Sequence, residues 1–208
     1  MLPAVDHLVY AAPSLDAGIE AMAERLGVTA AYGGKHTGIG THNALLSLGR
    51  NVYLEIIAPD PEQPRPKEPL PFGLGELHEP GLAAWALVVA DIDSRAEAAR
   101  DAGYDPGPVV PMTRVLPEGG ALSWRLTLRR PIAGNGLVPF LIQWVTGPHP
   151  SASSPGGCTL TDLTAEHPRP DDISRMTSAV GGDLSLAEAA RPALIATIEG
   201  PHGTVVLT

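Results

Sequence analysis

The feature that most constrains the fold of this chain is an internal repeat. The segment VYAAPSLDAGIEAM in the first half superposes on ALVVADIDSRAEAA in the second, with Leu15 over Ile92 and Asp16 over Asp93. In each copy, an apolar stretch that suits a β-strand leads into a helical pattern. A repeat of this length indicates duplication of one folded module, because a solenoid would need several shorter units. We therefore expect two copies of one module in this chain.

The first module, residues 4–59, is expected to have the order β-α-β-β-β. In chain order its elements are a strand at 4–11, a helix at 15–27, a strand at 28–32, a flexible glycine-rich loop at 33–40, and a hairpin with strands at 42–48 and 52–58. Leu15, Ile19, Met22 and Leu26 follow helical spacing, and Gly27 can end the helix. The turn between the hairpin strands carries glycine and asparagine, which tolerate positive φ.

The second module, residues 81–147, repeats this order. Its elements are a strand at 82–90, a helix at 92–103, a short strand at 109–110, and strands at 121–128 and 137–145. Residues 59–80, between the modules, contain a dense run of prolines with charged residues among them. This composition favours an extended connector across the surface, and the alternative is a lid over a pocket.

The tail, residues 157–208, follows a linker of sequence SASSPGG and indicates a strand, a helix and two strands. It is a shortened third copy, βαββ, and is too small to bury its own apolar face. We expect it to pack on the domain formed by residues 1–150 or on another subunit. The fold class is therefore α+β: paired βαβββ modules form an open, curved mixed β-sheet cup with helices outside. The exposed edges of such a sheet would allow a homodimer.

Composition narrows the class of protein. Apolar residues make up 44% of the 208 residues and charged residues 18%, as in globular proteins, and the net charge is −9. This negative charge argues against nucleic acid and against an anionic membrane as partners. The single cysteine, Cys158, fits a reducing compartment. We find no signal-peptide pattern and no apolar run near 20 residues, so we expect a cytoplasmic protein.

Glu55 is the most unusual residue of the first module, because it lies inside the apolar strand YLEIIA. A carboxylate there is unfavourable unless a cation or a proton compensates it. Alternate strand residues share a face, so Tyr53, Glu55 and Ile57 point one way. Either His42 or Asn43 on the partner strand shares the face of Glu55, and the register decides which one. Glu55 is thus a candidate general base or metal ligand.

Four motifs in chain order resemble the vicinal oxygen chelate superfamily and, within it, the glyoxalase-like domain branch. They are DHLVYAAPSLDAGI, GTHNALLSLG, YLEIIAPDP and PFLIQW followed by HP. The resemblance covers residues 5–150 and implies an open cup built from βαβββ modules. In many members the cup holds a divalent metal that polarises substrate oxygens, while others have lost the metal and bind small molecules.

The resemblance places metal ligands on the first and last strands of each module. In the first module these positions fall on His7 and Glu55, whose nitrogen and oxygen donors suit Zn²⁺, Fe²⁺, Mn²⁺ or Ni²⁺. In the second module they fall on Ala84, which cannot bind a metal, and on Gln143, whose amide is a poor ligand. The chain therefore departs from the four-ligand pattern of the superfamily. His7, Glu55 and a borrowed His42 could still form an open three-ligand site.

Further candidates for contact with a substrate come from the same strands. The set comprises His42, Asn43, Trp124, Arg125 and Gln143. Among these, Arg125 could bind a substrate carboxylate with two parallel hydrogen bonds. His149, after the last strand of the second module, has the features of a turn residue.

Three functions remain open on the sequence alone. The first is a metal-dependent lyase, isomerase or dioxygenase-type enzyme that uses His7 and Glu55 on a small polar molecule. The second is a metal-free protein that binds or sequesters a small molecule. The third, a scaffold with a vestigial pocket, is the weakest. The fold class does not decide between them.

Overall fold

The computed structural model describes residues 4–115 and 119–208. The first module contains β1 (Val5–Ala11), α1 (Leu15–Leu26), β2 (Ala31–His36), β3 (Thr41–Ser47) and β4 (Tyr53–Pro59). The second contains β5 (Gly81–Val88), α2 (Ile92–Asp101), β6 (Val109–Val115), β7 (Ala121–Thr127) and β8 (Phe140–Thr146). The two predicted modules are thus present, and each has the order β-α-β-β-β.

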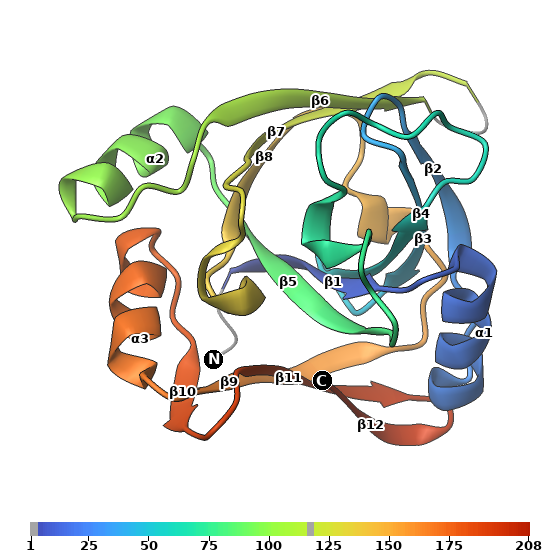
Figure 1. Cartoon of the computed structure of the whole chain (residues 1–208). Coiled ribbons are helices and arrows are strands. Elements are labelled where there is room, and N and C mark those ends of the chain that lie inside the picture. Colours follow the sequence, from blue (N-terminus) through green and yellow to red (C-terminus); the bar gives the residue numbers. More distant parts are fainter. Residues whose placement is uncertain (1–3, 116–118) are drawn as a thin grey trace.

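The eight strands of the two modules form one curved sheet in the order β2-β3-β4-β1-β5-β8-β7-β6. The order is symmetric about the antiparallel pair β1–β5, and in each module the first strand pairs in parallel with the last. The sheet curves far enough to bring β2 close to β6, which makes a nearly closed cup (Figure 1). The predicted α+β cup is therefore confirmed.

Two strands are longer or displaced relative to the prediction. β2 runs to His36 through Gly33 and Gly34, where the sequence indicated a loop, and β6 extends from Val109 to Val115 rather than ending at Val110. Both segments lack a continuous apolar pattern because they form the two edges of the cup. These extensions bring additional polar side chains onto the concave face.

The tail contains β9 (Thr159–His167), α3 (Pro170–Ala179), β10 (Ser185–Glu188), β11 (Ala193–Gly200) and β12 (Gly203–Leu207). It has a short strand, β10, that the βαββ prediction missed. Its sheet order, β10-β9-β11-β12, differs from that of the modules because β9 pairs with β11. The tail therefore repeats the element order of a module without repeating its sheet.

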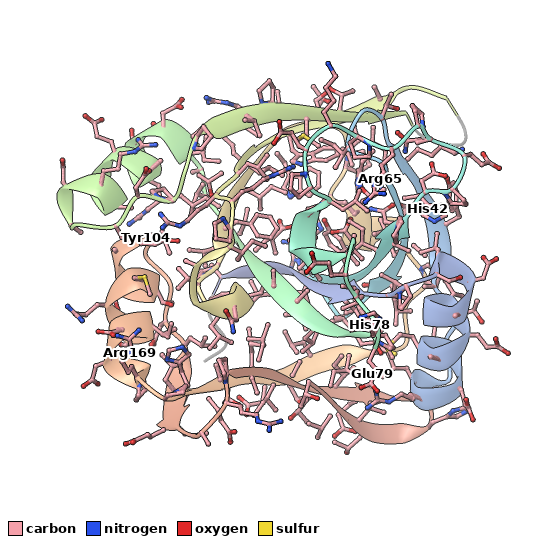
Figure 2. All side chains as sticks on the ribbon, viewed as in Figure 1. His42, Arg65, His78, Glu79, Tyr104 and Arg169 are labelled. Atoms are coloured by element: carbon pink, nitrogen blue, oxygen red, sulfur yellow. The ribbon has the colours of Figure 1, made fainter. Side chains whose placement is uncertain are left out.

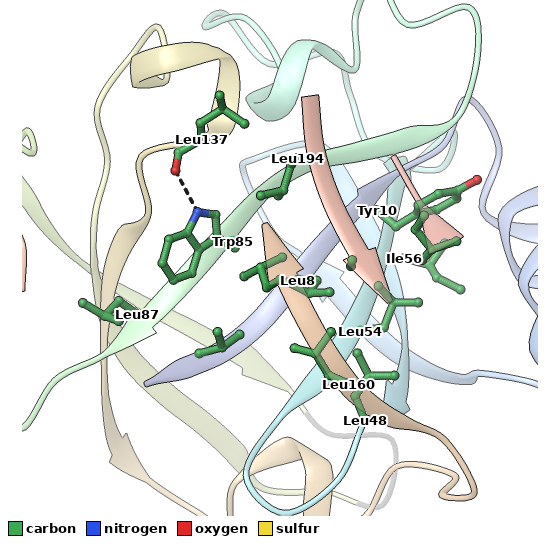
Figure 3. Packing of buried hydrophobic residues seen from close by; sticks show 14 of the residues in the cluster. Leu8, Tyr10, Leu48, Leu54, Ile56, Trp85, Leu87, Leu137, Leu160 and Leu194 are labelled. Carbon is green, nitrogen blue, oxygen red and sulfur yellow. Dashed lines mark hydrogen bonds between the residues drawn. The ribbon is translucent and has the colours of Figure 1, made fainter. Parts of the chain in front are cut away.

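The main core lies between the convex face of the cup and the tail. Leu8, Leu54 and Trp85 point away from the concave face and pack with Leu160 and Leu194 of the second sheet (Figure 3). The Trp85 indole nitrogen donates to the Leu137 carbonyl at 2.9 Å, so its one polar atom is satisfied inside this core. The tail thus covers the outside of the central strands and leaves the concave face available.

Within the described residues, the structure has no helix that is both long and apolar enough to span a bilayer.

Candidate functional site

The concave face of the cup encloses a cavity of about 830 Å³. Its walls come from the inward residues of the curved sheet and from two connecting segments, residues 68–79 and 128–139. The parallel register of β1 and β4 sets His7 against Tyr53 and Val9 against Glu55. His7 and Glu55 therefore lie on the same face of the sheet, and both line the cavity. Their nearest atoms, His7 Nε2 and Glu55 Oε2, are 3.8 Å apart.

His7 is oriented by the residue before it. Between two neighbouring β1–β5 pairs, β1 advances by two residues, from Val5 to His7, while β5 advances by only one. Asp6 is therefore the extra residue of a β-bulge. The Asp6 carboxylate lies beside the imidazole ring, with Oδ1 2.7 Å from His7 Nδ1. An ionised carboxylate can only accept, so Nδ1 carries the hydrogen and Nε2 faces Glu55 and the cavity. His7 is 3% exposed and is held in one orientation.

Asp6 is fully buried and accepts three hydrogen bonds. Besides His7, the Trp144 indole nitrogen donates to its Oδ2 at 2.7 Å, and His149 Nε2 lies 3.2 Å from the same oxygen. Burial raises the pKa of Asp6, but the hydrogen bonds from His149, His7 and Trp144 and the charge of His7 outweigh it and hold the pKa far below its usual value. Asp6 is therefore ionised. His149 belongs to this network rather than being only a turn residue.

Glu55 is 8% exposed and contacts two further polar side chains. Asn43 Nδ2 donates to its Oε1 at 2.5 Å, and His36 Nε2 lies 3.8 Å from the same oxygen. The predicted site residue Asn43 therefore lies in the cavity. His36 was missed, because residues 33–40 suggested a loop. It is fixed by a 2.9 Å contact between its Nδ1 and the Thr41 hydroxyl, and burial lowers its pKa.

Aromatic rings surround the polar cluster. The ring of Tyr53 stacks on His7 with centroids 4.6 Å apart, and Phe140 meets His7 edge-on at 5.4 Å. Trp124, another predicted site residue, lines the cavity from β7 and lies next to Trp144. These rings exclude water from the imidazole and strengthen its electrostatic interactions.

Three predicted site residues do not line the cavity. His42 and Arg125 are on the other face of their strands, because each follows or precedes an inward residue by one position. The ring of His42 meets that of Tyr32 edge-on with centroids 6.4 Å apart, and the Arg125 guanidinium makes two 2.7 Å hydrogen bonds to the Asp93 carboxylate. Figure 2 labels His42 on the side of the molecule where β2, β3 and β4 lie. Gln143 donates to the Ala90 carbonyl at 2.6 Å and so positions the start of α2. Each of the three has a structural partner of its own.

The strand register also revises the match between the modules. Val9 of β1 pairs with Glu55, and Ala86, its counterpart in β5, pairs with Phe140. The position equivalent to Glu55 is therefore Phe140 rather than Gln143. The apolar runs around both residues look alike in sequence, and only the pairing shows which one faces inward. Ala84 keeps its expected place as the counterpart of His7.

The connector between the modules contributes to the cavity wall, as the lid alternative supposed. Leu70, Phe72 and Leu77 line the cavity, and Leu74 is buried beside them. Arg130 Nη1 donates to the Pro69 carbonyl at 2.8 Å and links the connector to the second module. In Figure 1 this segment, coloured teal, lies within the curve of the sheet. The cavity is thus polar around His7 and Glu55 and apolar beneath the connector.

The model of the glyoxalase-like domain family matches residues 5–181. A crystal structure of a hypothetical protein from Staphylococcus aureus has a TM-score of 0.65 and 17% identity, covering 97% of this chain and 83% of that one. None of the curated proteins matches.

Two methylmalonyl-CoA epimerase structures are also similar. The enzyme from Mycobacterium tuberculosis has a TM-score of 0.44 and 21% identity over 72% of this chain and 92% of its own. An epimerase in complex with methylmalonyl-CoA and NH4+ has a TM-score of 0.49 and 24% identity over 72% of this chain and 100% of its own. At 17% identity, the Staphylococcus aureus structure supports the fold alone. Because the family model spans most of the chain, the protein belongs to the glyoxalase-like domain family, as its sequence motifs predicted.

Proposed function

We propose that this protein is an enzyme that moves protons on a small molecule held in the cup, in an isomerase- or lyase-type reaction. The observation that carries the proposal is the chain of contacts Asp6–His7–Glu55 at the wall of a cavity of about 830 Å³. A cavity of this size, mostly apolar with few convergent polar groups, suits one small ligand.

The two proton-transfer groups have distinct surroundings. Glu55 is the base: Asn43 occupies its Oε1, which leaves Oε2 for the substrate. His7 takes or returns a proton at Nε2, 3.8 Å from that oxygen. Asp6 keeps the imidazole ring in place and offsets the positive charge that His7 acquires, as a buried carboxylate does behind a catalytic histidine. Neither proton transfer, at Glu55 or at His7, requires a group from outside this chain.

The divalent metal expected from the resemblance fits these residues poorly. The second module offers Ala84 and Phe140 at the two ligand positions, and the N–H of Asn43 already occupies one oxygen of Glu55. Within residues 4–115 and 119–208, no three His, Cys, Asp or Glu side chains are arranged to hold an ion. The residues at this site therefore give no support to a metal-dependent step. Elemental analysis of protein purified without chelator should find well below one ion per chain, unchanged by His7→Ala or Glu55→Ala.

The test is exchange of carbon-bound hydrogen with solvent. Purified protein in D₂O is incubated with small carbon acids, among them 2-oxobutanoate and a methylmalonyl thioester, and proton NMR follows loss of the α-hydrogen signal. We expect exchange with at least one compound, and a loss of at least about 100-fold in Glu55→Gln and His7→Asn. Arg125→Ala, on the outer face of β7, should retain the wild-type rate.

The same assay separates the enzyme from a binding protein. Thermal stabilisation by the compounds without exchange would overturn the catalytic proposal and favour the metal-free binding module. Exchange that persists in Glu55→Gln would show that the base lies elsewhere.

A further inference from the structure

A buried positive charge, Arg114, also lies on the concave face. Arg114 of β6 is 6% exposed and lines the cavity together with Met112 and Leu122. Its guanidinium crosses the gap between the two edge strands of the cup, and Nη1 donates to Asn43 Oδ1 at 3.2 Å. Gly33 of β2 makes the crossing feasible, since a Cβ at this position would come closer than 3.0 Å to both groups.

Arg114 lacks a counter-charge among the residues that the structure describes. No carboxylate there lies within 4.0 Å of it, and its Nε is enclosed without a hydrogen-bond partner. The Asn43 bond is the one hydrogen bond that its side chain makes within the same part of the chain. A guanidinium removed from water is costly unless an anion or several acceptors compensate it. The guanidinium N–H donors of Arg114 that have no acceptor therefore favour the binding of an anionic ligand.

Asn43 connects this charge to the base. Its amide oxygen accepts from Arg114, and its amide nitrogen donates to Glu55 Oε1. The cation and the base are thus separated by the width of one amide group. A ligand anion beside Arg114 would hold the adjoining atoms of the ligand next to Glu55.

We propose that Arg114 binds a carboxylate of the substrate and so places the neighbouring carbon at Glu55. The inference rests on the proposed function and specifies its substrate class as a small monocarboxylate with an apolar body. A planar guanidinium matches a carboxylate with parallel hydrogen bonds. The next arginines along the cavity, Arg129 and Arg130, are exposed and donate to the carbonyls of Asp105 and Pro69. The inner end therefore offers one cation, which matches one negative charge better than a phosphate dianion.

The test compares each carboxylate with its neutral isostere. Propionate and butyrate, propionamide and butyramide, and inorganic phosphate are titrated at constant ionic strength, and binding is followed by calorimetry and thermal shift. We expect the carboxylates to bind at least about tenfold more tightly than the amides, because the hydrogen bonds of the Arg114 guanidinium to an ionised acceptor are stronger than those to a neutral one. Arg114→Gln should abolish this preference, and Arg129→Gln, at the cavity mouth, should keep it.

A second measurement covers the case in which Arg114→Gln does not fold. In wild-type protein labelled with ¹⁵N-arginine, the Nε–H resonance of one buried arginine should shift with propionate and stay in place with propionamide. An unchanged preference for carboxylates in folded Arg114→Gln, or the absence of such a shift, would overturn the inference. Tighter binding of phosphate than of propionate would also overturn it.

The two proposals can fail separately. Glu55→Gln should lose hydrogen exchange but keep carboxylate binding, because it leaves the Arg114 guanidinium in place. Carboxylate binding that depends on Arg114 without any exchange would refute the catalytic proposal alone. Exchange that proceeds equally in Arg114→Gln would refute the carboxylate site alone.

Discussion

Asp6 shows how a single buried charge can organise a site. Three donors surround its carboxylate, and two of them, Trp144 and His149, come from β8 and from the segment that follows it. The bulge that exposes Asp6 to these donors also fixes the ring of His7. The geometry of His7 therefore depends on residues more than a hundred positions away in sequence.

His149→Ala should measure this dependence. Losing one hydrogen bond to a buried charge costs roughly 1.5–3 kcal/mol of unfolding free energy. Because the pKa of Asp6 is lowered in the folded protein, this contribution is present above the ordinary carboxyl pKa of about 3.9 and is lost as the pH falls below it. Urea unfolding at pH 7 checks the value, with His78→Ala, an exposed histidine, as control. Equal stability of both variants would contradict the network.

His36 provides a pH test in the neutral range. Burial lowers its pKa in the folded protein, although the charge of Glu55 opposes the shift. Below about pH 6.5 the unfolded chain then binds more protons than the folded one. The free energy of unfolding therefore decreases as the pH is lowered through that range. Stability should decrease from pH 7.5 to pH 5.5 in wild type and decrease less in His36→Gln. An identical pH slope in both proteins would refute this assignment.

Sequence alternation placed His7 and Glu55 each on a definite strand face but could not show that the two faces coincide. That depends on the parallel register of β1 and β4, which is set by the whole module. For the same reason, the sequence could not decide that Asn43 lies in the cavity and that His42 does not. The arginine that we propose as the carboxylate ligand is Arg114 and not the predicted Arg125, because the strand that carries Arg114 was predicted to end at Val110.

At the scale of elements, the two edge strands of the cup determine the polar end of the cavity. β2 supplies His36 and Gly33, and β6 supplies Arg114. Both strands contain residues of low strand propensity, such as glycine and proline, so the sequence underestimated their length. The central strands, with continuous apolar runs, were predicted within a few residues of their observed bounds. His36 and Arg114 were missed because they lie on these two strands.

Gly33→Ala tests the contact between these edges. The added methyl would overlap Asn43 Oδ1 and Arg114 Nη1, so one of them must shift and their hydrogen bond should break. Overpacking of this kind costs roughly 1–3 kcal/mol. Carboxylate binding should weaken together with stability, as measured by calorimetry and urea unfolding. Gly75→Ala is the matched control, because no atom lies within 4 Å of its added carbon. Wild-type behaviour of Gly33→Ala would contradict the tight crossing.

At the scale of the whole molecule, the duplicated modules surround the cavity and the tail supports them from behind. The repeat in the sequence predicted the symmetric sheet, but the tail departs from the module plan because its sheet packs on β1 and β5 rather than continuing the cup. Backbone hydrogen bonds join the two parts: Leu160 N donates to Leu48 O at 3.0 Å, and Leu82 N donates to Thr208 O at 3.0 Å. The buried apolar residues on the outer face of the cup and those of the tail form one cluster.

A shared core should make the chain unfold as one unit. We expect a single calorimetric transition with equal calorimetric and van't Hoff enthalpies, although the tail carries its own sheet. Leu160→Ala, a large-to-small change in the tail, should cost about 2–5 kcal/mol and lower the midpoint of that one transition. The transition followed by near-ultraviolet dichroism, which reports Trp85, Trp124 and Trp144 of the cup, should shift by the same amount. Two separate transitions, with the tryptophan transition unchanged in Leu160→Ala, would mean that the cup is stable without the tail. A common shift of both signals would mean that the strands carrying His7 and Glu55 depend on the tail for their stability.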